Sequence, residues 1–140
     1  MFVHESYFFY EKDAEKKSIR KESFDCNELE NIFFEILRAD VAKLEKYIFS
    51  KEKEHLSIEK RFLLEKENDF YMVTLYEEND ESGDAEVRTM TNNDAQVGNT
   101  QIFGEYWNNA FLLEKRDESL IKKAVFEFFD KGQVSYDLMD

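Results

Sequence analysis

Apolar residues recur along this chain with two different spacings. Every second position is typical of a strand, and every third or fourth position is typical of a helix. Residues 3–10 are rich in aromatic side chains and predict a first strand. Residues 11–22 are mostly charged, which indicates a solvent-exposed connection.

The next segment has helical spacing. Asp25 or Asn27 can cap a helix, and its apolar positions are Leu29, Ile32, Phe33, Ile36 and Leu37. Val41, Leu44, Tyr47 and Ile48 continue this period and predict a second helix after a kink.

The period then changes to that of extended chain. Leu56, Ile58, Phe62 and Leu64 indicate one extended segment, and residues 70–76 predict a strong strand. That strand has apolar groups on both faces, so it is either covered twice or meets a partner with its outer face. Residues 87–91 predict a weaker strand.

The last third predicts a hairpin and a helix. Asn108 and Asn109 tolerate the positive φ of a tight turn, which would join strands at 101–107 and 110–115. Asp117 can cap a helix, and Gly132 stands at its left-handed C-terminal end. The apolar face of this helix comprises Ile121, Ala124, Val125, Phe128 and Phe129. Val134, Tyr136 and Leu138 alternate, as in a short final strand.

These elements predict an α+β fold. We expect one domain over residues 1–140, with a central and mainly antiparallel sheet, an N-terminal helix or helices and a C-terminal helix. Apolar residues make up 42% of the 140 residues, which is enough for one core.

Compartment and membrane contact follow from what the sequence lacks. It has no long apolar stretch and no basic leader, so we expect neither a transmembrane helix nor a signal peptide. Cys26 is the single cysteine, which fits a reducing compartment. The expected location is the cytoplasm.

Charge restricts the partners. The formal net charge is −13, of which residues 61–140 contribute −10. Nucleic acid and anionic lipid repel such a chain, whereas basic surfaces attract it. The alternative is that the acidity serves only solubility.

The sequence shows no known catalytic or cofactor-binding motif. His4 and His55 have no metal-binding neighbours at helical spacing, and Cys26 beside Asp25 is expected to be a buried or inert thiol. Residues 79–84 only distantly match a calcium loop. We therefore expect no metal, no cofactor and no enzyme. A small acidic enzyme with carboxylate-based catalysis remains an alternative.

The segment 77–94 is the candidate interface. Its acidic residues form either a solvated loop or an anionic patch that covers the basic active site of another protein. Tyr106 and Trp107 are candidate aromatic anchors beside it, although Trp107 is as readily a core residue. The expected partner-binding residues are Glu77, Glu78, Asp80, Glu81, Asp84, Glu86, Tyr106 and Trp107.

The C-terminal part carries a family resemblance. The helix from Leu120, with the pair Phe128-Phe129, runs into Gly132 and a last short strand. This pattern resembles the ending of small immunity proteins from bacterial polymorphic-toxin and contact-dependent-inhibition systems. The segment from Gly104 to Leu113 also lies where that family has a strand pair. That family often has a proline and a tryptophan after the glycine, and this chain has residues 133–136, Gln-Val-Ser-Tyr, instead.

The resemblance implies a cytoplasmic protein that binds and neutralises one cognate toxin domain. Many such toxins are nucleases or deaminases with basic surfaces, which suits an acidic partner. The alternative binding function is an acidic adaptor or a nucleic-acid mimic.

Overall fold

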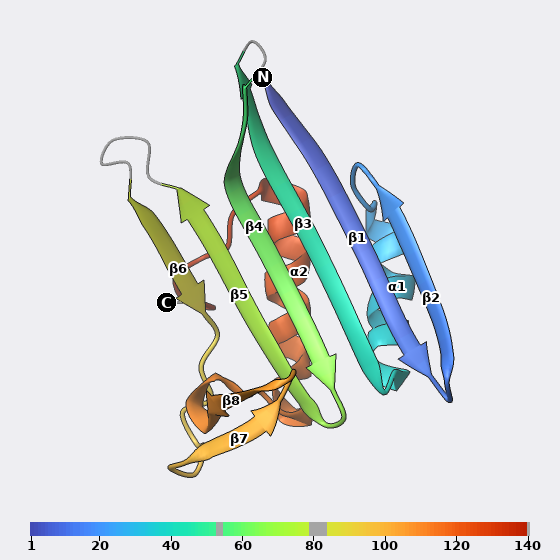
Figure 1. Ribbon diagram of the computed structural model, residues 1–140, viewed down its shortest axis with the longest axis vertical. Coiled ribbons are helices and arrows are strands. Elements are labelled where there is room, and N and C mark those ends of the chain that lie inside the picture. Colours follow the sequence, from blue (N-terminus) through green and yellow to red (C-terminus); the bar gives the residue numbers. More distant parts are fainter. Residues whose placement is uncertain (53–54, 79–83, 140) are drawn as a thin grey trace.

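A six-stranded antiparallel sheet lies at the centre of the protein (Figure 1). The computed structural model describes residues 1–52, 55–78 and 84–139. The strand order is β2-β1-β3-β4-β5-β6. The bounds are β1 Phe2–Lys12, β2 Glu15–Lys21, β3 Val41–Glu52, β4 His55–Glu67, β5 Phe70–Glu78 and β6 Ala85–Thr89.

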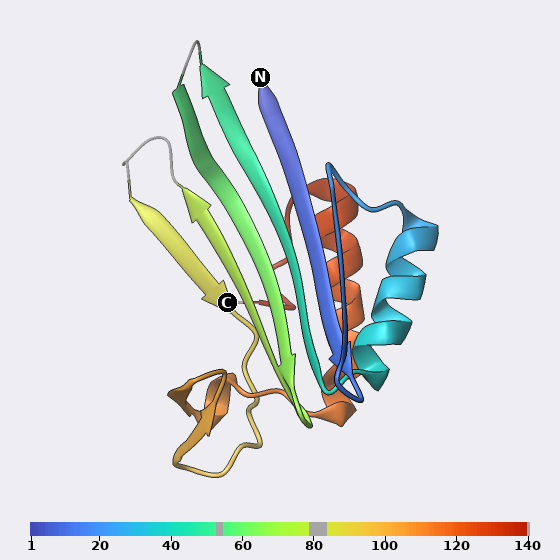
Figure 2. The ribbon, with the colours of Figure 1, turned by 45° about the vertical axis from the view of Figure 1, so that its right-hand side comes forward.

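Two helices cover one face of this sheet. They are α1 (Cys26–Arg38) and α2 (Glu118–Lys131), and Figure 2 shows both on the same side. A separate hairpin of β7 (Asn99–Ile102) and β8 (Glu105–Asn108) lies at one end of the sheet. Two short 3₁₀ helices follow it, η1 (Asn109–Phe111) and η2 (Lys115–Asp117). The predicted α+β class is therefore confirmed.

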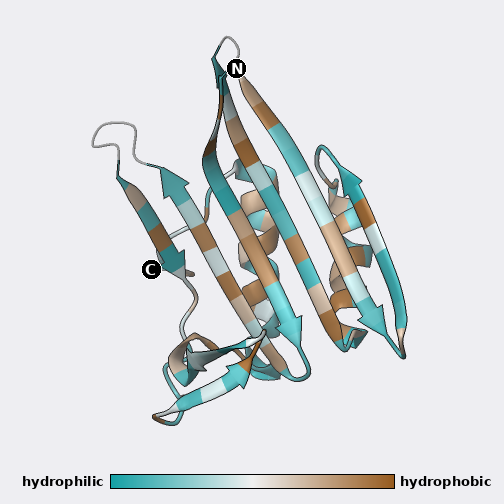
Figure 3. Ribbon diagram, in the orientation of Figure 1, coloured by the Kyte–Doolittle hydropathy of each residue, from teal (hydrophilic) through white to brown (hydrophobic). Residues whose placement is uncertain are grey.

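The core lies between the sheet and the helices. Phe8, Leu44, Leu64 and Val73 pair in register across β1, β3, β4 and β5, and all four are buried. Because strand side chains alternate between faces, every second residue from this row also faces the helices. Figure 3 shows the matching alternation of apolar and polar bands along β3 and β4.

Both helices begin and end near the predicted residues. At the start of α1, Asp25 accepts a hydrogen bond from the Glu28 backbone at 2.8 Å, and Glu28 accepts one from the Asp25 backbone at 3.1 Å. This reciprocal pair forms a capping box. At the end of α2, Gly132 has a φ of 71°, which confirms the predicted left-handed cap.

The predicted second helix is wrong. Residues 41–52 form β3, whose helix-facing positions are Ala42, Leu44, Lys46 and Ile48. Lys46 occupies one apolar position of this row, and its ammonium group donates to the Ser23 hydroxyl at 3.0 Å. The charged residue hides the two-residue period, so the remaining apolar residues match helical spacing.

The predicted connection at residues 11–22 is also wrong, because β2 lies there. It pairs antiparallel with β1 through a tight turn at Asp13 and Ala14, which have φ angles of 51° and 69°. All seven residues of β2 are exposed, so burial imposes no apolar period on them.

The hairpin lies in a different place from the predicted one. Its turn is formed by Phe103 and Gly104, with φ angles of 54° and 79°, as a type I′ turn requires. Asn108 instead caps η1, since its side chain accepts from the Ala110 backbone at 3.0 Å. The segment predicted as strand 110–115 contains the end of η1, the start of η2 and a single antiparallel bridge between Leu113 and Tyr71, and no strand.

The predicted final strand is absent from the described residues 133–139, of which residues 136–138 form a turn. Arg88 on β6 donates to the carbonyl groups of Val134 at 2.7 Å and Met139 at 3.1 Å. These two hydrogen bonds fix the backbone without a neighbouring strand.

Candidate binding surface

The sheet presents a second face, opposite to the helices, which we call the open face. Its residues include Glu5, Tyr7, Phe9, Glu45, Tyr47, Phe49, Arg61, Glu65 and Tyr76, on β1, β3, β4 and β5. Figure 2 shows no helix of the described residues on this side. All five aromatic side chains of the set are only partly buried, so their rings remain accessible to a partner.

Contacts within β3 and between β3 and β4 hold two of these rings in place. Tyr47 and Phe49 stack with a centroid distance of 5.3 Å and an interplanar angle of 9°. The guanidinium group of Arg61 lies 5.4 Å from the centre of the Tyr47 ring. Stacking and cation–π contacts hold the rings in place, which lowers the entropy lost on binding.

A carboxylate lies among these rings. Glu45 is 8% exposed, and it accepts hydrogen bonds from the Arg61 guanidinium group and from the Tyr47 hydroxyl at 3.2 Å. Burial and the Glu45 charge raise the pKa of Tyr47. The ion pair thus orients both the tyrosine and the arginine on the open face.

Glu65, on the same face, is partly buried. Burial is the main cause that raises the pKa of Glu65, although the charges of Lys43 and Arg61 act in the opposite direction. At the edge nearest β2, Glu5 pairs with Arg20 at 3.0 Å, and Arg20 lies 5.1 Å above the Tyr7 ring. The surface therefore combines apolar area with fixed charges of both signs.

The acidic residues predicted from the sequence separate in the structure. Glu77 faces the helix side, where it pairs with Arg88 at 2.8 Å and Lys60 at 3.4 Å. Glu78 is partly buried at the end of β5 on the open face, and Asp84 and Glu86 are exposed near the start of β6. Asp80 and Glu81 lie outside the described residues.

The predicted aromatic anchors do not lie beside this acidic segment. Tyr106 is 71% exposed and Trp107 is partly buried, both on β8. Figure 1 places the β7–β8 hairpin at the opposite end of the sheet from the start of β6. The acidic segment and the hairpin are therefore separate surfaces.

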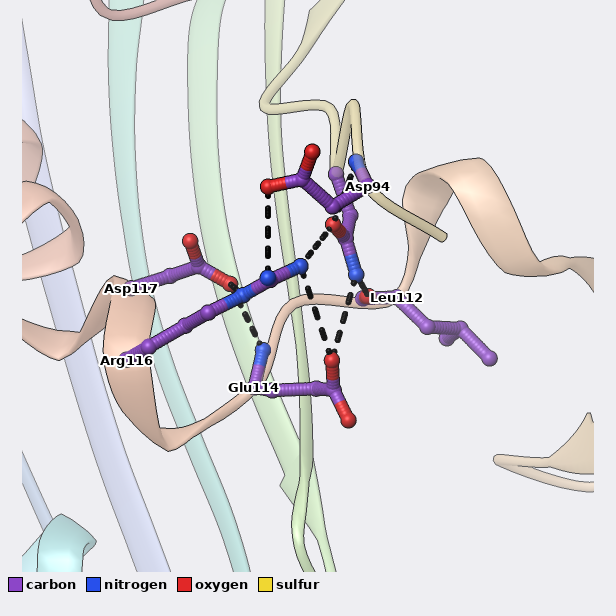
Figure 4. Close-up of polar contacts among 6 residues, drawn as sticks. Asp94, Leu112, Glu114, Arg116 and Asp117 are labelled. Atoms are coloured by element: carbon purple, nitrogen blue, oxygen red, sulfur yellow. Dashed lines mark hydrogen bonds and ion pairs between the residues drawn. The ribbon is translucent and has the colours of Figure 1, made fainter. Parts of the chain in front are cut away.

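A polar cluster fixes the base of the hairpin. Arg116 donates to Asp94 at 3.2 Å and also contacts the Asn92 side chain (Figure 4). Glu114 and Asp117 lie 3.7 and 3.9 Å from the same guanidinium group. A cavity of about 330 Å³ adjoins the cluster. These contacts connect the segment before β7 to the segment before α2, which is a structural role.

The remaining candidates from the sequence are the single cysteine and a possible metal site. Cys26 is exposed at the start of α1, so of the two expected alternatives, a buried thiol or an inert one, burial is wrong. It borders a groove of about 750 Å³ between the two helices and the C-terminal residues. Among residues 1–52, 55–78 and 84–139, no three His, Cys, Asp or Glu side chains could hold a metal ion. No helix in those ranges is long and apolar enough to cross a membrane.

Sequence reasoning missed most of the open face. Tyr47 and Phe49 were hidden in the segment predicted as a helix, and Glu45 with them. The signal that could have found them is the alternation of Glu45, Tyr47 and Phe49 with the more apolar positions 44 and 48.

Known proteins include relatives of this chain in fold and in sequence family. A solved structure described as a hypothetical protein from Neisseria gonorrhoeae is similar, with a TM-score of 0.69 and 17% sequence identity. The match covers 96% of this chain and 92% of that one, and at this identity it shows a shared fold. No curated protein matches the chain. Residues 3–138 match a family of unknown function, and the chain therefore belongs to the DUF6911 family.

Proposed function

We propose that this chain is a binding protein that neutralises a cognate toxin domain by forming a tight complex over its active site. The open face carries this proposal, because it offers accessible aromatic rings that are already held by stacking and ion pairs. Aromatic and arginine side chains are enriched among the residues that dominate protein interfaces.

Charge favours a partner protein with a basic surface. The net charge of −13 steers a basic partner toward the chain over long distances. Nucleases and deaminases expose basic surfaces, which agrees with the resemblance of the C-terminal part to immunity proteins. Glu78, on the same face as the rings, is placed to contribute to such steering.

The central test is a binding measurement with the protein encoded next to this chain. Tyr47→Ala and Phe49→Ala should each weaken the affinity by about tenfold or more, as expected for interface hot spots. Phe34→Ala is the matched control, because its ring is 54% exposed on α1, away from the open face. Circular dichroism must show that all three variants fold. Wild-type affinity in both open-face variants would exclude this surface.

Inhibition is measured in the same system. The chain should abolish the nuclease or deaminase activity of the toxin at a molar ratio of one to one, and excess substrate should not restore the activity of a tight complex. Binding without inhibition would favour the adaptor alternative.

The acidic segment is tested separately. Reversing Glu78, Asp80 and Glu81 to lysine should slow association and reduce its salt dependence, since peripheral charges act mainly on the association rate. The kinetics should be recorded at a low and a high salt concentration. An unchanged association rate at low salt would leave the acidity as a solubility feature.

A further inference from the structure

The outer edge of β2 has unusual chemistry for this chain. Its seven residues, Glu15–Lys21, include four basic side chains and one acidic one, whereas the whole chain has a net charge of −13. All seven are exposed. β2 is the end strand of the sheet, so its outward backbone groups have no strand beside them among the described residues (Figure 1).

β2 lacks two of the usual features that prevent an edge strand from pairing. It contains no proline, and it pairs with β1 without a bulge over its whole length. β6, at the other edge, has five residues. A strand of seven residues is long enough to form a regular ladder with one more strand.

The basic side chains decide which strand can pair. Lys16 and Lys17 have no hydrogen-bond or ion-pair partner in the part of the chain that the structure describes. Two ammonium groups at an edge repel another copy of the same edge, but they attract an extended segment that carries carboxylates.

A groove runs beside this edge on the helix side. It has a volume of about 410 Å³ between β1, β2 and α1, and Phe8, Ile19 and Ile32 form its apolar part. Ile19 is 51% exposed, so its side chain is available beside the edge. A strand added to β2 would point alternate side chains toward this groove.

We propose that the outer edge of β2 binds an extended acidic peptide segment of a partner protein by strand addition. Backbone hydrogen bonds along β2 supply the pairing, Lys16 and Lys17 select carboxylates, and the groove accepts an apolar side chain at an alternate position. This surface is distinct from the open face and does not depend on the toxin-binding proposal.

Lys16 and Lys17 are consecutive residues of β2, so their side chains point to opposite faces of the sheet. The probe is therefore a short synthetic peptide of glutamate and valine residues with a fluorescent label, in which two adjacent glutamates place a carboxylate on each face of the added strand. It should bind the full chain, and Lys16→Glu/Lys17→Glu should weaken this binding by about tenfold because two attractive contacts become repulsive. Lys115→Glu/Lys123→Glu is the matched control with the same net charge, and both of its sites are exposed elsewhere. Melting curves by circular dichroism verify that both variants fold.

Backbone pairing is tested with two altered peptides. N-methylation of alternate amides on the edge that faces β2 should abolish binding, whereas methylation of the other set should not. A peptide with lysine in place of glutamate should not bind. In hydrogen exchange, the amides of residues 15–21 should become protected on peptide addition.

Four results would overturn the proposal. Three of them are no binding of the acidic peptide, equal loss of binding in both charge-reversed variants, and equal binding of all N-methylated peptides. A fourth is self-association of the free chain with protected β2 amides, which would assign this edge to a second copy.

Discussion

The side-chain nitrogen of Lys66 lies 3.0 Å from the carbonyl oxygen of Ile36, so a buried lysine of β4 caps the C-terminal end of α1. The same nitrogen donates to the Leu37 carbonyl at 2.9 Å. Lys60, also on β4, donates to the Gly132 carbonyl at 2.6 Å, just after α2. One central strand thus supplies positive charge to the C-terminal ends of both helices, where the helix dipole favours it.

Lys66→Met should lower the free energy of unfolding by about 1–3 kcal/mol, because the buried Ile36 carbonyl and the partly buried Leu37 carbonyl lose their donor. Burial lowers the pKa of Lys66, so removing the charge recovers part of the desolvation cost. Urea unfolding followed by circular dichroism measures the change. Lys51→Met, at an exposed site, is the control, and equal stability of the two variants would contradict the capping role.

Arg88 is 2% exposed and connects β6 to the C-terminal residues through Val134 and Met139. Arg88→Met should cost about 3–5 kcal/mol, because it leaves the Glu77 carboxylate with one partner fewer in a partly buried site. Adding Glu77→Gln to this variant should recover part of the loss. Additive effects in this double-mutant cycle would show that the two side chains do not interact.

Phe128 is fully buried on α2 and stacks on Phe62 with a centroid distance of 5.2 Å. Phe128→Ala should lower the free energy of unfolding by about 3–5 kcal/mol through lost burial and a residual cavity. Phe34→Ala, at an exposed position of α1, should cost far less. If the Phe128 variant melted like the wild type, the residue would not belong to the core.

Ala14 has a φ of 69° in the turn between β1 and β2, in the left-handed region that favours glycine. Ala14→Gly should therefore raise the free energy of unfolding by about 1 kcal/mol, since the strain of a left-handed non-glycine residue is of that size. Ala39→Gly, in extended backbone after α1, should destabilise instead. The melting temperatures of both variants, compared with that of the wild type, test this prediction.

Glu65 provides a pH test. Its pKa is raised in the folded state, so the ionised form disfavours folding, and this cost appears as the pH rises above the unfolded pKa. Glu65→Gln should raise the melting temperature at pH 7, whereas the difference should vanish in acid, where the carboxyl group is protonated in both states. A lower melting temperature at pH 7 would show that Lys43 and Arg61 outweigh burial.

The sequence predicted the fold class and both helices, because capping residues and apolar stripes are local signals. It failed where a distant contact decides the structure. Lys46 donates a hydrogen bond to Ser23, and Arg88 donates one to the Val134 carbonyl group. The local pattern of apolar and polar residues indicates neither contact. The periods of residues 41–48 and 134–138 therefore predicted the wrong elements.

The prediction of the site residues failed for a related reason. Charge identified Glu77 as a contact, but the ion pair with Arg88 places it on the helix side. β2 was missed because an exposed edge strand buries nothing, and its turn has Ala14 where glycine or asparagine would have indicated a hairpin. The open face combines residues of four strands, so its members cannot be recognised before the pairing register of these strands is known.

Trp107, the single tryptophan, has a spectroscopic consequence. Its indole N–H is buried without a hydrogen-bond partner among the described residues, on a hairpin that is not part of the six-stranded sheet. Intrinsic tryptophan fluorescence will therefore report the local environment of β8. If the hairpin detaches first, the emission will shift before the circular dichroism of the sheet changes, and the difference between the two midpoints measures how tightly the hairpin is coupled to the core.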